Sequence, residues 1–153
     1  MANSLQQTLQ TAIAREAAAY ELYKSTAQLV APGPAREMLL ALAAQEQGHR
    51  TRLEHVLERG AFERLTLAQQ ERVVDLKITD YLVTAPLSAD ATLQDILIVA
   101  GQREAGSHAL YSALAQVAED DQTRSLFEFL ANEELRHKQT VEKLYDELFY
   151  SEN

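Results

Sequence analysis

The feature that most constrains how this chain can fold is a glutamate and histidine pair that occurs twice, at an offset of 88 residues. Glu46 and His49 are three residues apart, and Glu134 and His137 have the same spacing. Residues at i and i+3 of an α-helix are neighbours on its surface, so each pair places a carboxylate beside an imidazole. The pattern therefore predicts two helices that present the same two functional groups.

A further glutamate precedes each pair by thirty residues, at positions 16 and 104. The two copies together supply four carboxylates and two imidazoles, which are typical ligands of iron or manganese, and two divalent cations would balance the four negative charges. Salt bridges at the edge of a helix face are the alternative role for these glutamates, but they do not account for the matched spacing. We interpret six residues as a buried two-metal site: Glu16, Glu46, His49, Glu104, Glu134 and His137.

The two copies belong to an internal repeat, in which residues 5–60 align with residues 93–148 without a gap. Apolar residues recur in both at steps of three and four, which is the period of an amphipathic helix. The sequence Pro32-Gly33-Pro34 is expected to end one helix and begin the next, and Thr92 with Asp95 is expected to cap a third. These signals predict helices within four ranges: 4–27, 34–60, 92–118 and 121–150.

The connection between the two copies, residues 61–90, is less regular. We expect a short helix over 65–76 and a loop over 84–90. A connection of this length can cross a helical bundle from end to end, which allows the third long helix to run parallel to the second. Several apolar residues in it need cover from another surface, which predicts at least a homodimer: Tyr81, Leu82, Val83 and Leu87.

The composition excludes several classes of protein. The chain has 153 residues and few Gly and Pro, which favours a single all-α domain over residues 1–153. It contains no cysteine, so disulfides, thiolate metal sites and iron–sulfur clusters are excluded. The net charge of -9 argues against nucleic acid and anionic membranes as partners. No secretory signal and no run of ~20 apolar residues is visible, so we expect a soluble, cytoplasmic protein.

The arrangement of one Glu from each of two helices and Glu-x-x-His from each of two others resembles the ferritin-like superfamily. Within it, the chain is similar to the rubrerythrin-type di-iron domain over essentially its whole length. The resemblance implies an all-α, ferritin-like four-helix bundle with a long crossover between the second and third helices. It also implies a centre of two iron ions, with manganese as the alternative, in which Glu46 and Glu134 bridge the metals. The other four residues would be terminal ligands.

The chain departs from rubrerythrins in two respects. Rubrerythrins commonly carry an additional glutamate one turn after the third-helix glutamate, and Ser107 occupies that place here. Many also carry a rubredoxin domain with cysteine ligands, which this chain lacks. The set of six ligands is therefore nearer to a bacterioferritin-type ferroxidase centre.

Two tyrosines and two further histidines complete the set of candidate residues. Tyr23 and Tyr111 each follow a candidate glutamate ligand by two helical turns, so their phenols are expected either to hydrogen-bond a ligand carboxylate or to be ordinary core residues. His108 is expected to lie near the site or at the surface without binding metal, because its counterpart in the repeat is Tyr20. His55 is expected to face solvent.

Three functions are compatible with these features. The first is a ferroxidase or peroxidase-type oxidoreductase that oxidises Fe(II) and reduces dioxygen or hydrogen peroxide, with electrons from an external donor. The second is an iron-binding or storage protein in which oxidation serves only for loading. The third is a helical bundle that binds zinc or no metal and acts through its surface. Metal content after anaerobic purification would distinguish the third from the first two.

Overall fold

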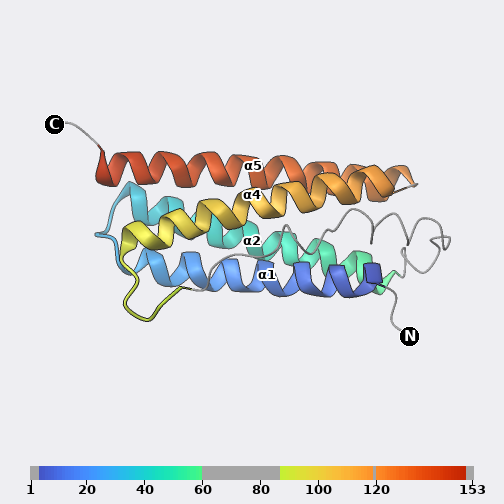
Figure 1. Cartoon of the computed structure of the whole chain (residues 1–153), viewed down its shortest axis with the longest axis horizontal. Helices are drawn as coiled ribbons and strands as arrows, with labels where there is room; N and C mark the ends of the chain where they lie inside the picture. The colour runs from blue at the N-terminus through green and yellow to red at the C-terminus, as the bar shows by residue number, and fades with distance from the viewer. Residues whose placement is uncertain (1–3, 60–86, 119, 151–153) are drawn as a thin grey trace.

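The chain forms four long α-helices in a computed structural model that describes residues 4–59, 87–118 and 120–150 (Figure 1). Their bounds confirm the four predicted helical ranges, and none of the four is long and apolar enough to cross a membrane. The helices are α1 (Ser4–Ala27), α2 (Pro34–Glu58), α4 (Leu93–Val117) and α5 (Asp121–Phe149).

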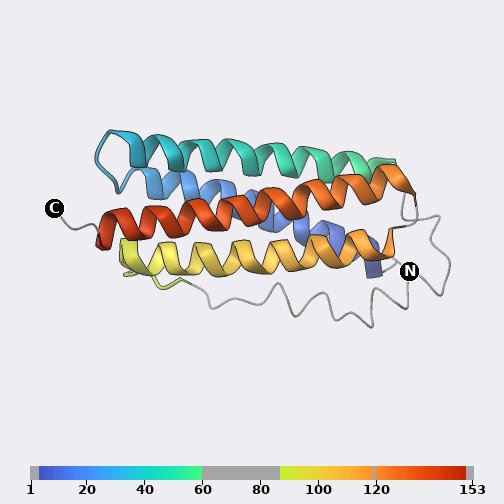
Figure 2. The same cartoon turned by 90° about the horizontal axis from the view of Figure 1, so that it is seen from above.

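The helices pack as two antiparallel hairpins that lie against each other along the long axis of the bundle (Figure 1 and Figure 2). The first hairpin consists of α1 and α2, and the second of α4 and α5. Helix α2 ends at the opposite end of the bundle from the start of α4, so these two helices run parallel. This confirms the ferritin-like bundle with a long connection between its second and third helices.

Two predictions for that connection lie outside the described residues. They are the short helix over 65–76 and the cover required by Tyr81, Leu82 and Val83. Leu87, which is described, is half-buried. The homodimer inferred from these four apolar residues therefore stays a prediction.

Each hairpin is closed by an arginine that binds carbonyl groups at the preceding turn. Arg36 Nε donates to the carbonyl oxygens of Ala27 and Val30, at 2.9 and 3.0 Å. At the equivalent position of the second hairpin, Arg124 donates to the carbonyl oxygen of Ala118. These contacts satisfy carbonyl groups that have no partner within a helix at its C-terminal end. The two turns are thus held by the same type of contact.

The predicted helix starts are present in the structure. Gly33 has a φ of 148°, which residues with a Cβ rarely adopt, and Pro34 occupies the first turn of α2. Thr92 and Asp95 form a capping box at the start of α4, as the sequence predicts. Asp120 caps α5 by accepting a hydrogen bond from the backbone of Thr123. Local sequence signals therefore fix where each of these three helices begins.

The core has two apolar clusters separated by a polar layer. One cluster fills the half of the bundle near the turn between α4 and α5, with residues such as Leu9, Leu53, Leu114 and Phe127. The other fills the half near the turn between α1 and α2, with residues such as Leu39, Leu42, Leu97 and Leu144. All four helices carry a candidate metal ligand between their contributions to the two clusters. The apolar clusters thus enclose the candidate site from both ends.

Candidate metal centre

The six candidate ligands are all buried in the polar layer between the two hairpins. Each has 3% or less of its surface exposed. Four carboxyl groups in such a small buried volume repel one another when ionised, and each loses its hydration. A cation, a proton or a hydrogen bond must therefore compensate each of them. The six residues are Glu16 on α1, Glu46 and His49 on α2, Glu104 on α4, and Glu134 and His137 on α5.

Two of the carboxylates lie between the two imidazoles. Glu134 Oε1 is 3.0 Å from His49 Nδ1, and its Oε2 is 3.7 Å from His137 Nδ1. Glu46 Oε1 contacts His137 Nδ1 and lies 3.9 Å from His49 Nδ1. One ligand atom from each of these four residues falls within 4.8 Å of the others. The glutamate and histidine pair of α2 and that of α5 thus form one shared cluster.

The other two carboxylates each lie beside one imidazole of their own hairpin. Glu16 Oε2 is 3.8 Å from His49 Nδ1, and Glu104 Oε2 is 3.7 Å from His137 Nδ1. Both of these oxygen atoms are fully buried and have no hydrogen-bond partner within the described residues. Buried carboxylate oxygens are normally satisfied, so both atoms are available to bind a cation. The arrangement fits two metal ions, one beside each histidine.

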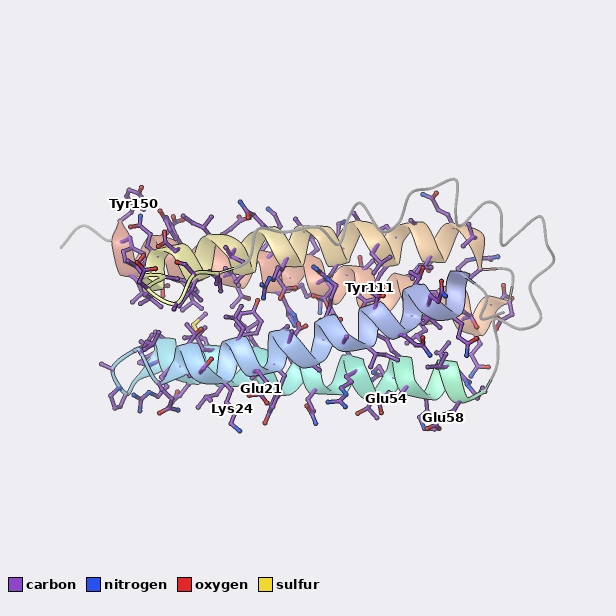
Figure 3. The ribbon with its side chains drawn as sticks, turned by 60° about the horizontal axis from the view of Figure 1, so that its bottom comes forward. Glu21, Lys24, Glu54, Glu58, Tyr111 and Tyr150 are labelled. Atoms are coloured by element: carbon purple, nitrogen blue, oxygen red, sulfur yellow. The ribbon has the colours of Figure 1, made fainter. Side chains whose placement is uncertain are left out.

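The two tyrosines hold the remaining oxygens of these outer carboxylates, and they do so across the hairpins. Tyr23 on α1 donates to Glu104 Oε1 on α4 at 2.6 Å, and Tyr111 on α4 donates to Glu16 Oε1 on α1 at 2.6 Å. Figure 3 shows Tyr111 between the two hairpins. Each carboxylate is therefore fixed at one oxygen by a phenol and presents its other oxygen to the centre.

Removing one of these phenols is expected to weaken both the fold and the site. We expect Tyr111→Phe to leave Glu16 Oε1 without its buried donor and to lower the free energy of unfolding by about 1–3 kcal/mol. Metal affinity should fall about 10–100-fold, as for other residues that orient a ligand. Urea unfolding and competitive metal titration measure the two effects.

Tyr145→Phe is the matched control, because Tyr145 accepts a hydrogen bond from Gln94 at the end of the bundle, away from the polar layer. This variant should retain the metal affinity of the wild-type protein. Equal losses of affinity in Tyr111→Phe and Tyr145→Phe would show that the phenol of Tyr111 does not orient a ligand.

The imidazoles are positioned from the face of the bundle formed by α2 and α5. Their rings stack with centroids 5.2 Å apart. Gln45 Oε1 lies 2.6 Å from His137 Nε2, and because an amide oxygen only accepts hydrogen bonds, this contact places the proton on Nε2. His137 Nδ1 then keeps its lone pair for the centre. The rings of His49 and Phe129 instead form a T-shaped pair with centroids 6.4 Å apart, and Arg52 lies over the Phe129 ring.

The environment of the site changes the pKa values of its members. Burial raises the pKa of Glu46, Glu104 and Glu134 well above the usual range, and the negative charges of neighbouring carboxylates add to this effect. Burial acts in the same direction on Glu16, but its neighbours Glu46, His49 and Glu134 favour its ionised form and lower its pKa to about 2. These shifts favour retention of protons by Glu46, Glu104 and Glu134 in the metal-free site.

The site opens toward the face formed by α1 and α4 through a cavity of about 170 Å³. All four carboxylates line this cavity, whereas the two histidines do not. Arg15 and Arg103 also line it, and Arg15 Nη2 lies 3.5 Å from the carbonyl oxygen of Arg103. Ser107 lines the same cavity. Small molecules can therefore approach the carboxylates from the side opposite the imidazoles.

His55 was expected to face solvent, and it is exposed. His108 was expected near the site or at the surface, and its Nδ1 donates to the carbonyl oxygen of Ala131 at 2.7 Å. Gln45 was not predicted from the sequence, because its contact to His137 joins two helices and leaves no spacing signal. Arg15 and Arg103 were not predicted either, although both precede a candidate ligand and coincide in the repeat.

Comparison with protein families identifies the family of helical bundles to which the chain belongs. The rubrerythrin family model matches residues 7–89 and 95–153, which is nearly the whole chain. The chain belongs to the rubrerythrin family. No rubredoxin domain is found in it, which agrees with its lack of cysteine. No curated protein and no solved structure matches the chain significantly.

Membership of the rubrerythrin family gives the buried cluster its role. The glutamate and histidine side chains between the two hairpins form the di-metal site of this family. Rubrerythrins are typically oxidoreductases that act as peroxidases.

Proposed function

We propose that this rubrerythrin-family chain is a di-iron oxidoreductase, with manganese as the alternative metal, that oxidises Fe(II) and reduces dioxygen or hydrogen peroxide. The observation that carries the proposal is the division of six buried ligands into two equivalent halves with two shared carboxylates. Two divalent cations neutralise four carboxylates and leave both imidazoles neutral. Such a centre satisfies every buried group in the polar layer.

The distances support a specific role for each ligand. Glu16 and His49 would hold one metal ion, and Glu104 and His137 would hold the other, because each of these pairs is in contact within its own hairpin. Glu46 and Glu134 would bridge the two ions. That role is supported by the distances of both carboxylates to both imidazoles, whereas Glu16 and Glu104 each pair with one.

The chain itself supplies binding, orientation and access. When bound, a pair of ferrous ions supplies the electrons for reduction of the oxidant. Tyr23 and Tyr111 hold the outer carboxylates, and the stacked imidazoles close the face formed by α2 and α5. The cavity between α1 and α4 admits a small oxidant. Because the chain has no cysteine, electrons must come from an external donor that carries its own redox group.

Anaerobic loading with Fe(II), followed by exposure to each oxidant, tests the proposal. We expect two iron ions per chain by elemental analysis and repeated turnover when an excess of reductant is present. The storage alternative predicts retention of ferric iron far above two per chain without turnover. One or no iron after anaerobic loading would refute the two-metal centre and with it both functions.

Ser107 provides a test of the preferred oxidant. It is short and neutral and cannot replace the additional carboxylate of a peroxidase-adapted rubrerythrin site, although it faces the same cavity as Glu104. We expect the wild-type centre to prefer peroxide over dioxygen less strongly than a seven-ligand site does. Ser107→Glu should shift the preference toward peroxide, because it adds an anionic ligand in the cavity.

Stopped-flow oxidation of the ferrous protein by each oxidant measures this preference before and after the substitution. Ser112→Glu is a suitable control, because Ser112 lines a different groove between α4 and α5. A wild-type centre that reacts orders of magnitude faster with peroxide would contradict the prediction, since another residue would then supply the missing function.

A further inference from the structure

The two imidazoles of the metal centre have different surroundings, although their candidate ligand partners are equivalent. Each histidine lies beside one outer glutamate, and a tyrosine holds each outer carboxylate at the same distance of 2.6 Å. The difference lies on the face formed by α2 and α5, where the two halves of the repeat carry different residues. Three pairs of equivalent positions differ in this way: Gln45 and Glu133, Gly48 and Arg136, and Ala41 and Phe129.

His137 is held by a hydrogen bond through the ring nitrogen that does not contact the carboxylates. Gln45 Oε1 lies 2.6 Å from His137 Nε2. Because an amide oxygen only accepts hydrogen bonds, this contact keeps the proton on Nε2 and also fixes the rotation of the ring. The structure therefore orients His137 for binding through Nδ1 by a contact outside the carboxylate cluster.

His49 makes no equivalent contact within the described residues. Glu133, which corresponds to Gln45 in the repeat, has its Oε2 atom 3.8 Å from Arg136 Nη1, and Arg136 stands where the first hairpin has a glycine. The ring of His49 is instead paired with Phe129, with centroids 6.4 Å apart. Such a contact between rings positions the imidazole without selecting which nitrogen carries the proton, as a hydrogen bond does.

This difference favours the position beside His137 for the first metal ion. A histidine binds metal through a nitrogen that carries no proton, so His49 must adopt one tautomer when it binds, whereas His137 already has it. Partners that orient a ligand in this way typically change metal affinity about 10–100-fold. The contacts of the two tyrosines are matched in length, and they therefore give neither position an advantage.

We propose that Gln45 is a positioning residue that makes the position of Glu104 and His137 the first to fill, with at least about a tenfold preference over the position of Glu16 and His49. The inference rests on the proposed function, because it requires two metal positions in one centre. A chain that carries a single ion should hold it beside His137. The ion beside His49 should be the first to leave.

Proton NMR of the protein titrated with Co(II) tests this proposal, because a paramagnetic ion shifts the N–H signal of the imidazole that binds it. Stepwise affinities do not identify the position, since repulsion between two cations weakens binding of the second ion even in a symmetric centre. Below one equivalent, we expect one shifted N–H signal at least about ten times as intense as the other. This first signal should persist in His49→Ala and be absent from His137→Ala.

Gln45→Met removes the hydrogen-bond acceptor while keeping a side chain of similar length and helix propensity. Gln45 is exposed, so the variant should fold, and below one equivalent it should give two shifted signals of comparable intensity. If it does not fold, Gln45→Ala replaces it. Gln45→Glu keeps an acceptor and should retain the single first signal.

Gln47→Met is the matched control, because it makes the same change at another exposed position of α2. This variant should retain the preference of the wild-type protein for one position. Loss of the preference in both Gln45→Met and Gln47→Met would show that it does not depend on the contact with His137.

The outcomes separate this inference from the proposed function. Two signals of equal intensity from the start of the titration, with two ions bound at saturation, would overturn the inference and leave the metal centre intact. A first ion beside His49, or a preference that Gln45→Met does not reduce, would also overturn it. Failure of the wild-type protein to bind a second ion would overturn the two-metal centre and the inference with it.

Discussion

Replacing Glu46 or Glu134 with alanine is expected to destroy the paired metal site and to leave at most one ion per chain. Each of these carboxylates lies between the two imidazoles, so its removal affects both proposed metal positions. Loss of a ligand from a mononuclear site weakens the binding of one ion, whereas loss of a shared ligand weakens the binding of two. Elemental analysis after anaerobic loading and gel filtration measures the number of ions retained.

Glu54→Ala is the control for this experiment. Glu54 has a counterpart in the repeat, Glu142, but it lies beyond the polar layer and forms a half-exposed ion pair with Arg50 at 2.7 Å. Figure 3 shows it at the outer side of the first hairpin. Exposed pairs of this kind contribute at most about 1 kcal/mol, so this variant should fold and retain two ions. Equal metal loss in all three variants would show that the ligand face is wrongly assigned.

The second large effect is expected in the stability of the metal-free protein as a function of pH. Glu46, Glu104 and Glu134 have pKa values raised well above 4.5 in the folded protein. Above pH 4.5 the unfolded chain therefore releases protons that the folded protein keeps, and the free energy of unfolding falls as pH rises toward the raised pKa values. The slope is about 1.4 kcal/mol per pH unit for each proton retained.

Two other residues of the site, Glu16 and His137, determine the pH range in which this effect is clearest. The pKa of Glu16 is lowered, so its contribution to stability is fully present above pH 4.5. Burial lowers the pKa of His137 below 6.5, so the contribution of His137 to the free energy of unfolding rises with pH up to about 6.5. Over that range it opposes the loss of stability caused by the glutamates. Above about pH 6.5 only the glutamate effect remains. The metal-free protein should therefore lose stability as pH rises above about 6.5 toward the raised glutamate pKa values.

Bound metal should reverse this dependence. Cations displace the retained protons, so metal affinity rises with pH, and binding stabilises only the folded state. Urea unfolding of chelator-treated and zinc-loaded protein at several pH values measures both curves. The two curves should diverge as pH increases, with the loaded protein the more stable by several kcal/mol at saturating metal. A metal-free protein whose stability is constant or increases over this range would contradict the raised glutamate pKa values.

The sequence alone predicted the elements of the fold and the composition of the site. Helical periodicity, the prolines around Gly33 and the cap formed by Thr92 and Asp95 are local signals, and they marked the helices correctly. The matched spacing of glutamates and histidines placed the six candidate ligands on inward faces, because a residue's face on a helix is set by its position along the chain. The resemblance to rubrerythrins indicated the position of Ser107, which lines the cavity of the site.

Only the tertiary structure decided how the two hairpins combine these residues. Spacing within a hairpin predicts that Glu16 lies near Glu46, but it does not give the rotation and separation of one hairpin relative to the other. The crossed hydrogen bonds of Tyr23 and Tyr111, the contact of Gln45 with His137, and the cavity between Arg15 and Arg103 all join different hairpins. Such contacts are set by the packing of side chains between helices, which no periodicity along a single helix records.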